Sequence, residues 1–326
     1  MGQGYADGVM NSDDIDKQFR SFPGIATQET DRSKVSQWWI HRQLPVFFGL
    51  TSPILVLTGY LLCYFAPPQL LNQIAIDLVS NINSDILIFV VAGFTAQMID
   101  GALGMAYGVT ATSFLLSVGV PPAASSASVH ASEVVTSGVS GLMHLKFRNV
   151  NSKLFRNLLL PGVLGAIVGA WVLTSFEQYN RFINPAISVY TMTLGLLIII
   201  KALRKDRFRE KIKRIFPLAA IGGFLDSVGG GGWGPIVSST LIAGGRKAKY
   251  SIGSANLTEF FVSLASSITF FTLTGLTHLH IIGGLIIGGV IAAPIAALVA
   301  HKIPTRVTML LVGIVVIIVS LRRLFL

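Results

Sequence analysis

Four acidic residues stand inside otherwise apolar stretches of the chain, and they are the residues best suited to chemistry. They are Asp100, Glu133, Asp226 and Glu259. An ionisable group within a long apolar stretch is costly to bury and is therefore a functional candidate. A carboxyl group in a low-dielectric environment can exchange a proton near neutral pH, so Glu133 and Glu259 are candidates for proton coupling. The alternative is structural, with a protonated Glu hydrogen-bonding between helices.

The two aspartates each begin a glycine-rich interruption. Residues 100–108 read Asp-Gly-Ala-Leu-Gly-Met-Ala-Tyr-Gly, and residues 226–234 read Asp-Ser-Val-Gly-Gly-Gly-Gly-Trp-Gly. We expect Asp100 and Asp226 to act as hairpin caps that accept backbone N–H bonds, although a place beside a substrate is the alternative. Glycine lets a backbone approach a ligand closely, and a helix start presents N–H groups that bind anions. Tight packing of the interruptions against each other would use the same glycines.

Several further residues near the interruptions could line a binding site. Tyr107 and Trp233 occupy equivalent positions in the two interruptions and could either line a pocket or pack in the core. His130 lies three residues before Glu133, hence on the same helical face, where the two would line a cavity or form a structural pair. Serines there could donate hydrogen bonds or allow close helix packing. The predicted substrate-binding residues are Gly104, Tyr107, Gly108, Ser128, His130, Gly230, Gly231, Trp233, Gly234, Ser254 and Asn256.

The sequence predicts neither a cofactor nor a metal site. Cys63 is the single cysteine, which excludes an intrachain disulfide and a cysteine-based zinc site. Three glycines within residues 229–234 match the spacing of a dinucleotide-binding motif. That motif needs a preceding strand, and none is expected here.

Composition shows which elements must hold these residues. Of 326 residues, 52% are hydrophobic and only 12% are charged, whereas a soluble domain has about 25% charged residues. The chain is therefore predicted to be an all-α polytopic membrane protein. Stretches 86–119 and 215–245 are interrupted in the middle, so each is predicted to form a re-entrant hairpin, because its arms are too short to cross a bilayer. The predicted full-length spans are 44–66, 122–145, 157–176, 184–203, 250–273, 279–300 and 305–325.

Positive charge predicts the orientation of these spans. The net charge is +10, and two re-entrant hairpins with a cytoplasmic N-terminus would place 22 of the 25 Lys and Arg residues inside. Only Arg181, Arg322 and Arg323 would lie outside. Lys and Arg gather on the cytoplasmic side of membrane proteins, so this arrangement is favoured. We predict a bacterial-type inner (plasma) membrane protein, with the charge serving orientation and no binding of nucleic acid.

An internal repeat organises the chain. Residues 100–140 align without a gap to residues 226–266, at a shift of 126, and 11 of the 41 positions are identical. Each repeat contains one hairpin and three crossing helices, so the second copy is predicted to be inverted and the interruptions to meet near the bilayer midplane. The predicted segments are a cytoplasmic N-terminal segment at 1–43, an extra transmembrane helix and outer loop at 44–83, a first transport repeat at 84–203 and a second, inverted one at 204–325.

These features give the chain a family resemblance. Over roughly residues 84–325 it resembles the TauE/SafE permease family, known for sulfite and organosulfonate export. The resemblance is carried by the two glycine-rich interruptions, each followed by a Ser-rich helix, and by Gly138–Asn151 with its basic end. The second interruption is followed by Pro235, as is usual in the family, whereas the first has Val109 at that place. The resemblance implies export of a small sulfur-containing anion, bound at Gly104–Gly108 and Gly230–Gly234.

We therefore predict a secondary transporter rather than an enzyme. Its partners would be a sulfite or small organosulfonate anion, protons and membrane lipid. The anion would bind between the hairpin tips, with protonation of Glu133 or Glu259 offsetting charge repulsion, and access would alternate between the two sides. An uncoupled anion channel would use the same residues. An intramembrane enzyme is the third class, but no predicted span carries a Ser/His or paired-Asp signature of hydrolysis.

Overall fold

Every described segment of the chain is helical or a short connection. The computed structural model describes residues 72, 76, 85–103, 105–146, 148–203, 214–275, 278–299 and 305–325. Contacts divide the chain into Met1–Tyr64 and Phe65–Leu326, and all the described residues belong to the second unit. The predicted segment 1–43, the helix predicted at 44–66, Cys63 and Gly104 lie outside the described residues.

The helices fall where the hydropathy pattern predicts them. The first half contains α5 (Asp85–Leu103), α6 (Tyr107–Ser117), α7 (Pro122–Lys146), α8 (Ser152–Ser175), the short η2 (Glu177–Tyr179) and α9 (Asn180–Leu203). The second half contains α10 (Ile215–Gly229), a π-helical turn η3 (Gly234–Ser238), α11 (Ser239–Ala243), α12 (Ala248–Thr274), α13 (Leu279–Val299) and α14 (Thr305–Phe325). Both interrupted stretches are broken, between α5 and α6 and between α10 and η3.

Both halves have the same helix pattern. A shift of 126 residues carries α7, at 122–146, to 248–272, and α12 occupies 248–274. The same shift carries α8, at 152–175, to 278–301, and α13 occupies 279–299. The shared pattern therefore extends beyond the segment in which the two halves are recognisably similar in sequence.

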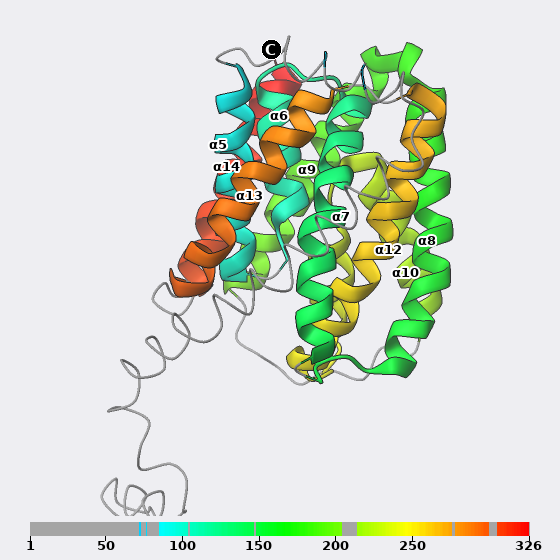
Figure 1. The fold of residues 1–326 in the computed structure, drawn as a ribbon, viewed down its shortest axis with the longest axis vertical. Coiled ribbons are helices and arrows are strands. Elements are labelled where there is room, and N and C mark those ends of the chain that lie inside the picture. The colour runs from blue at the N-terminus through cyan, green and yellow to red at the C-terminus, as the bar shows by residue number, and fades with distance from the viewer. Residues whose placement is uncertain are drawn as a thin grey trace, which may run out of the picture. The chain divides into compact units, whose positions relative to one another are not determined.

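The four most extensive helix pairs among the described helices each join the two halves (Figure 1). The most extensive packing is of α5 on α13, α10 on α8, α9 on α14, and α7 on α12. Exchanging the halves turns the α5–α13 pair into the α10–α8 pair and leaves the other two pairs unchanged. The helix that precedes each break is thus held by a helix from the opposite half.

Glycines allow these helices to approach closely. A Cβ added to Gly223 of α10 would lie 2.1 Å from the Gly162 carbonyl oxygen of α8. In the α5–α13 pair, a Cβ on Gly288 would lie 2.0 Å from the Val90 carbonyl oxygen. Small residues at such crossings let backbones touch. Close packing of this kind stabilises helix association in a membrane, where lipid tails are as apolar as the helices and the hydrophobic effect does not drive association.

The distribution of polarity is that of a membrane protein. The interior holds many polar side chains, including His130, Glu133 and Asp226, all buried. The outside is apolar: Leu160 on α8 is 62% exposed and Ile318 on α14 is 59% exposed. Three described helices are long and apolar enough to cross a membrane: Ser152–Ser175, Arg181–Leu203 and Lys249–Thr274. The Ser-rich α7 is less apolar because its neighbours cover it on several sides.

Replacing Gly223 with Val tests the close crossing of α10 and α8. The added side chain meets backbone, which cannot rotate away, so we expect overpacking to lower stability by about 1–3 kcal/mol. Thermal unfolding of the purified protein in detergent measures the loss. The control is Leu164→Ala, because Leu164 of α8 is 51% exposed and should tolerate the change. A Gly223→Val protein that unfolds at the wild-type temperature would contradict the described crossing.

Candidate functional site

The two breaks touch through their backbones. A Cβ added to Gly108 would lie 2.7 Å from Gly231 Cα, and a Cβ added to Gly231 would lie 2.3 Å from the Gly108 carbonyl carbon. Gly231 also has φ +141°, a conformation that other residues rarely adopt. Glycine is therefore required at this contact for both space and backbone geometry.

A second contact between the breaks has the same form. A Cβ added to Gly234 would lie 2.5 Å from the Met105 carbonyl oxygen. At the shift of 126 residues, Gly108 corresponds to Gly234 and Met105 corresponds to Gly231. The Gly108–Gly231 contact is therefore equivalent to the Gly234–Met105 contact. The breaks are thus joined by a matched pair of close approaches.

An aspartate closes each break. Asp100 Oδ1 accepts hydrogen bonds from Ala106 N at 2.8 Å and Tyr107 N at 3.2 Å, where α6 begins. Asp226 Oδ1 accepts one from Trp233 N at 2.8 Å, directly before η3. Each aspartate thus accepts backbone N–H bonds at the start of the following helix, from six or seven residues earlier in the chain. These N–H groups therefore face carboxylate oxygens and are not free to bind an anion.

Three side chains from elsewhere in the chain fix the second break. Tyr190 OH of α9 donates to the Gly231 carbonyl oxygen at 3.3 Å, and Thr112 Oγ1 of α6 donates to that of Gly230. Lys201 Nζ, at the end of α9, donates to the Pro235 carbonyl oxygen at 2.6 Å. None of these three residues belongs to the site predicted from the sequence, although Tyr190 is a polar side chain within an apolar helix.

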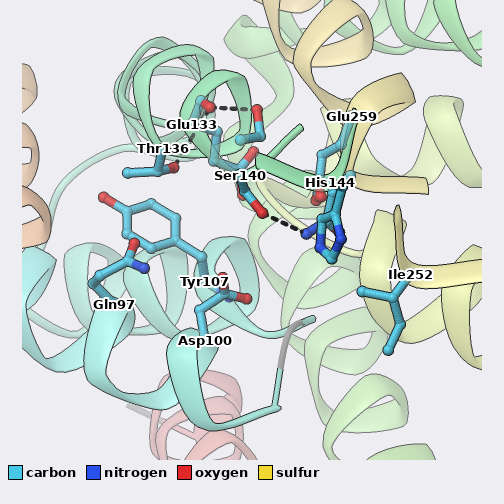
Figure 2. A pocket seen from close by; sticks show the side chains of 11 residues that line it. Gln97, Asp100, Tyr107, Glu133, Thr136, Ser140, His144, Ile252 and Glu259 are labelled. Atoms are coloured by element: carbon cyan, nitrogen blue, oxygen red, sulfur yellow. Dashed lines mark hydrogen bonds between the residues drawn. The ribbon is translucent and has the colours of Figure 1, made fainter. Parts of the chain in front are cut away.

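A cavity of about 220 Å³ lies on one side of the contact between the breaks (Figure 2). Its walls come from α5, α6, α7 and α12, and none of its eleven described lining residues is Lys or Arg. It extends to His144 near the end of α7 and Ile252 near the start of α12. The lining residues are Gln97, Asp100, Tyr107, Glu133, Thr136, Ser137, Ser140, His144, Ile252, Asn256 and Glu259.

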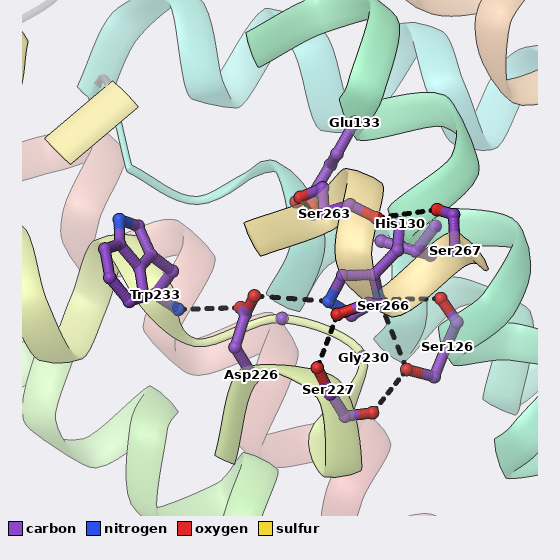
Figure 3. Close-up of polar contacts among 12 residues, drawn as sticks. Ser126, His130, Glu133, Asp226, Ser227, Gly230, Trp233, Ser263, Ser266 and Ser267 are labelled. Carbon is purple, nitrogen blue, oxygen red and sulfur yellow. Dashed lines mark hydrogen bonds and ion pairs between the residues drawn. The ribbon is translucent and has the colours of Figure 1, made fainter. Parts of the chain in front are cut away.

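On the other side of the contact, buried side chains form a closed hydrogen-bond network (Figure 3). His130 Nε2 lies 3.2 Å from Asp226 Oδ2, and His130 Nδ1 lies 2.8 Å from the Ser126 carbonyl oxygen. Ser126 Oγ donates to the Ser227 carbonyl oxygen at 2.6 Å, and the Ser227 and Ser266 hydroxyls are 2.6 Å apart. This network joins α7 to α10 and α10 to α12.

The closed network and the cavity use equivalent residues from the two halves. At the shift of 126 residues, the cavity residue Asp100 corresponds to Asp226, and Asn256 corresponds to His130. Further cavity residues correspond to members of the closed side, as follows: Ile252 to Ser126, Ser137 to Ser263, and Ser140 to Ser266. One set therefore encloses space while its counterpart is packed shut.

Glu133 belongs to both sides. Its side chain lines the cavity, while its Oε2 accepts a hydrogen bond from Ser263 Oγ at 3.2 Å, beside the closed network. His130, Glu133 and Asp226 bring one polar atom each to within 4.8 Å of one another. Titratable groups are thus concentrated where the two sides meet.

Several predicted site residues lie away from the cavity lining. Trp233 is fully buried in the core, and its Nε1 donates to the Ala255 carbonyl oxygen at 3.1 Å. Ser254 Oγ accepts a hydrogen bond from Asn151 N at 2.9 Å, which ties α12 to the start of α8. Ser128 is buried in α7. Five predicted site residues do line the cavity: Asp100, Tyr107, Glu133, Asn256 and Glu259.

Comparison with known proteins gives two matches. The sequence model of the family described as "Sulfite exporter TauE/SafE" matches residues 89–323. The "Probable membrane transporter protein YtnM" of Bacillus subtilis (strain 168) is 37% identical over 249 residues, which are 73% of this chain and 82% of that protein. No solved structure matches. The family match includes both breaks, the cavity and the closed network.

Replacing Gly231 with Ala tests the contact between the breaks. We expect a loss of about 1–2 kcal/mol for the positive φ and a further loss of about 1–3 kcal/mol because the Cβ meets Gly108 backbone. Gly119→Ala is the matched control, since Gly119 has φ +89° and nothing within 4 Å of its added Cβ. Thermal unfolding compares the two, and equal losses would argue against a tight contact at Gly231.

Proposed function

The chain belongs to the TauE/SafE sulfite exporter family, and we propose that it is a secondary transporter exporting sulfite or a small organosulfonate anion. It is an integral membrane protein, as the family and its apolar exterior require. The relative from Bacillus subtilis is named as a probable membrane transporter. The family supplies the class of function, and the geometry around the breaks supports a particular way of working.

The proposed architecture is two inverted repeats, covering 84–203 and 204–325, each with a re-entrant hairpin and three crossing helices. Three observations support it: the helix bounds agree at one shift, the helix pairs exchange between halves, and so do the backbone contacts at the breaks. Inverted repeats place their sites at the repeat interface, near the bilayer midplane. The charge distribution supports a cytoplasmic N-terminus, with the cavity opening toward the basic, cytoplasmic ends of α7 and α12.

Alternating access is the mechanism that this geometry supports best. The observation that carries the proposal is the pairing of an open cavity with a packed network built from equivalent residues. When two related halves take unlike conformations, exchanging those conformations would close the cavity and open the other side. The anion would bind in the cavity, in reach of Tyr107, Ser140 and Asn256.

Proton coupling follows from the charge of the cavity. Asp100, Glu133 and Glu259 line it without a compensating Lys or Arg among its described residues. Two like charges 4 Å apart repel by about 4 kcal/mol at an effective dielectric constant near 20, and 1.4 kcal/mol is already a tenfold loss of affinity. An anion can therefore bind well only if carboxyl groups are neutralised. We assign this role to Glu133 and Glu259, because Asp100 is engaged at the start of α6.

Replacing Glu259 with Gln tests the coupling. Gln keeps the size of the side chain but cannot take up a proton. We therefore expect the stimulation of sulfite transport into proteoliposomes by a pH gradient to fall about tenfold. Glu177→Gln, in η2 between α8 and α9, is the control. If Glu259→Gln and Glu133→Gln both keep the wild-type pH dependence, these residues do not couple protons. Conductance without counterflow would instead identify an uncoupled anion channel.

Thermal stabilisation by candidate anions tests the substrate class. A ligand that binds the folded state at 100 times its Kd adds about 2.7 kcal/mol of stability. We expect sulfite or an organosulfonate such as sulfoacetate or taurine to raise the unfolding temperature more than sulfate does. Methanesulfonate should stabilise more at acidic pH, because its own charge is constant while carboxyl groups in the cavity become neutral. Equal effects of sulfate and sulfite would contradict the proposed selectivity.

A further inference from the structure

The hydrogen bonds around His130 determine which ring nitrogen carries a hydrogen. Nδ1 lies 2.8 Å from the Ser126 carbonyl oxygen, which can only accept. The Ser126 hydroxyl is 3.3 Å from the same nitrogen, but its own hydrogen is directed to the Ser227 carbonyl oxygen at 2.6 Å. No donor is therefore available to Nδ1 in this arrangement, and Nδ1 must itself carry a hydrogen.

The opposite nitrogen then requires a second proton. Nε2 lies 3.2 Å from Asp226 Oδ2, and Asp226 Oδ1 already accepts from Trp233 N. With a neutral ring and an ionised carboxylate, two lone pairs would face each other across a buried contact. One proton between Nε2 and Oδ2 removes this conflict, whether it belongs to an imidazolium or to a carboxylic acid.

We propose that the His130–Asp226 pair is a proton-binding site, occupied in this conformation, and that losing the proton opens the closed side of the transporter. The inference deepens the proposed transport function and rests on it. It places a proton at a pair of residues distinct from Glu133 and Glu259, and it gives that proton a mechanical effect. The pair and the Ser126–Ser227 hydrogen bond are the described side-chain bonds that hold α7 to α10 at this side.

The surroundings of the pair make deprotonation disruptive. Without the shared proton, the Asp226 carboxylate would face the lone pair of Nε2 within a buried region that already contains other acidic groups. Phe270 of α12 packs against the His130 ring, with centroids 6.2 Å apart, which keeps the pair away from solvent. Two further titratable side chains lie near the pair: Glu133 of α7, with a carboxylate oxygen within 4.8 Å of both partners, and Tyr190 of α9, which donates to the Gly231 carbonyl oxygen. Asp100 of α5, Tyr107 of α6 and Glu259 of α12 line the cavity across the contact between the breaks.

The other repeat lacks this proton site. The counterpart of His130 is Asn256, whose Nδ2 donates to Ser140 Oγ at 2.9 Å, and the counterpart of Asp226 is Asp100. An amide has no proton to exchange in this pH range. The proposed proton-dependent closure is therefore built into one side of the protein only.

Replacing Asp226 with Asn tests the site while keeping its shape. The Asn side chain can still accept from Trp233 N through Oδ1 and can donate to His130 Nε2, so it imitates the protonated pair permanently. We expect a folded protein that transports sulfite about tenfold more slowly, with a rate that changes less between about pH 5.5 and 8 than the wild-type rate does, because only the dependence due to Glu133 and Glu259 remains. Glu177→Gln is the control, because it makes a carboxyl-to-amide change in η2, away from the cavity and the closed network, and should keep the wild-type rate and pH dependence.

Replacing His130 with Asn removes the exchangeable proton and copies the residue of the other repeat. We expect the pH dependence of its transport rate to be reduced as in Asp226→Asn but without the fixed closure, so its rate should exceed that of Asp226→Asn. A pH dependence equal to that of the wild type in both variants overturns the proposal. If the pH dependence is unchanged there but is lost in Glu133→Gln or Glu259→Gln, the proton acts at the glutamates and the proposed function stands.

A measurement that needs no transport keeps the two proposals separable. In protein labelled with 15N at histidine and embedded in nanodiscs, the His130 signals are those absent from His130→Asn. We expect a protonated Nδ1 throughout, with an Nε2 signal that changes with pH in the wild type and is constant in Asp226→Asn. A neutral ring with its hydrogen on Nε2 overturns the proposal. If sulfite is not transported at all, the proposed function fails while this spectrum still decides the proton site.

Discussion

The need to satisfy backbone polar groups deep within a membrane protein governs this structure. Where a helix breaks at membrane depth, its exposed N–H and C=O groups must find partners in the protein. Asp100 and Asp226 supply acceptors at the helix starts, and Tyr190, Thr112 and Lys201 supply donors to the second break. Because glycine allows the breaks to touch, the cavity is bounded by backbone held in place from several helices at once.

The two halves differ in how they pack around their breaks. Both contribute an aspartate, a glutamate and two serines at equivalent places around the breaks. On one side the aspartate and serines line a cavity, and on the other their counterparts are held in buried hydrogen bonds, while both glutamates line the cavity. A histidine on one side and an asparagine on the other is one of the chemical differences between them. The structure is thus a symmetric scaffold carrying an asymmetric pair of polar sites.

The described helices, the two breaks and the presence of acids within apolar segments could be predicted from the sequence. Hydropathy has a local period, and Asp followed by glycines is a local signal, so both can be read along the chain. The partners of those groups are not local: Lys201 and Ser126 meet their acceptors only through tertiary packing. For the same reason, residue type alone did not separate Asn256, which lines the cavity, from Ser254, which anchors the start of α8.

The exchange of packing partners between the halves has a consequence for how the protein could have originated. The helix before each break is supported by a helix from the other half, through close approaches at glycines. A single half would leave these helix faces uncovered. An ancestral gene encoding one half would therefore have needed two copies of its product, packed against each other before any fusion, to cover them.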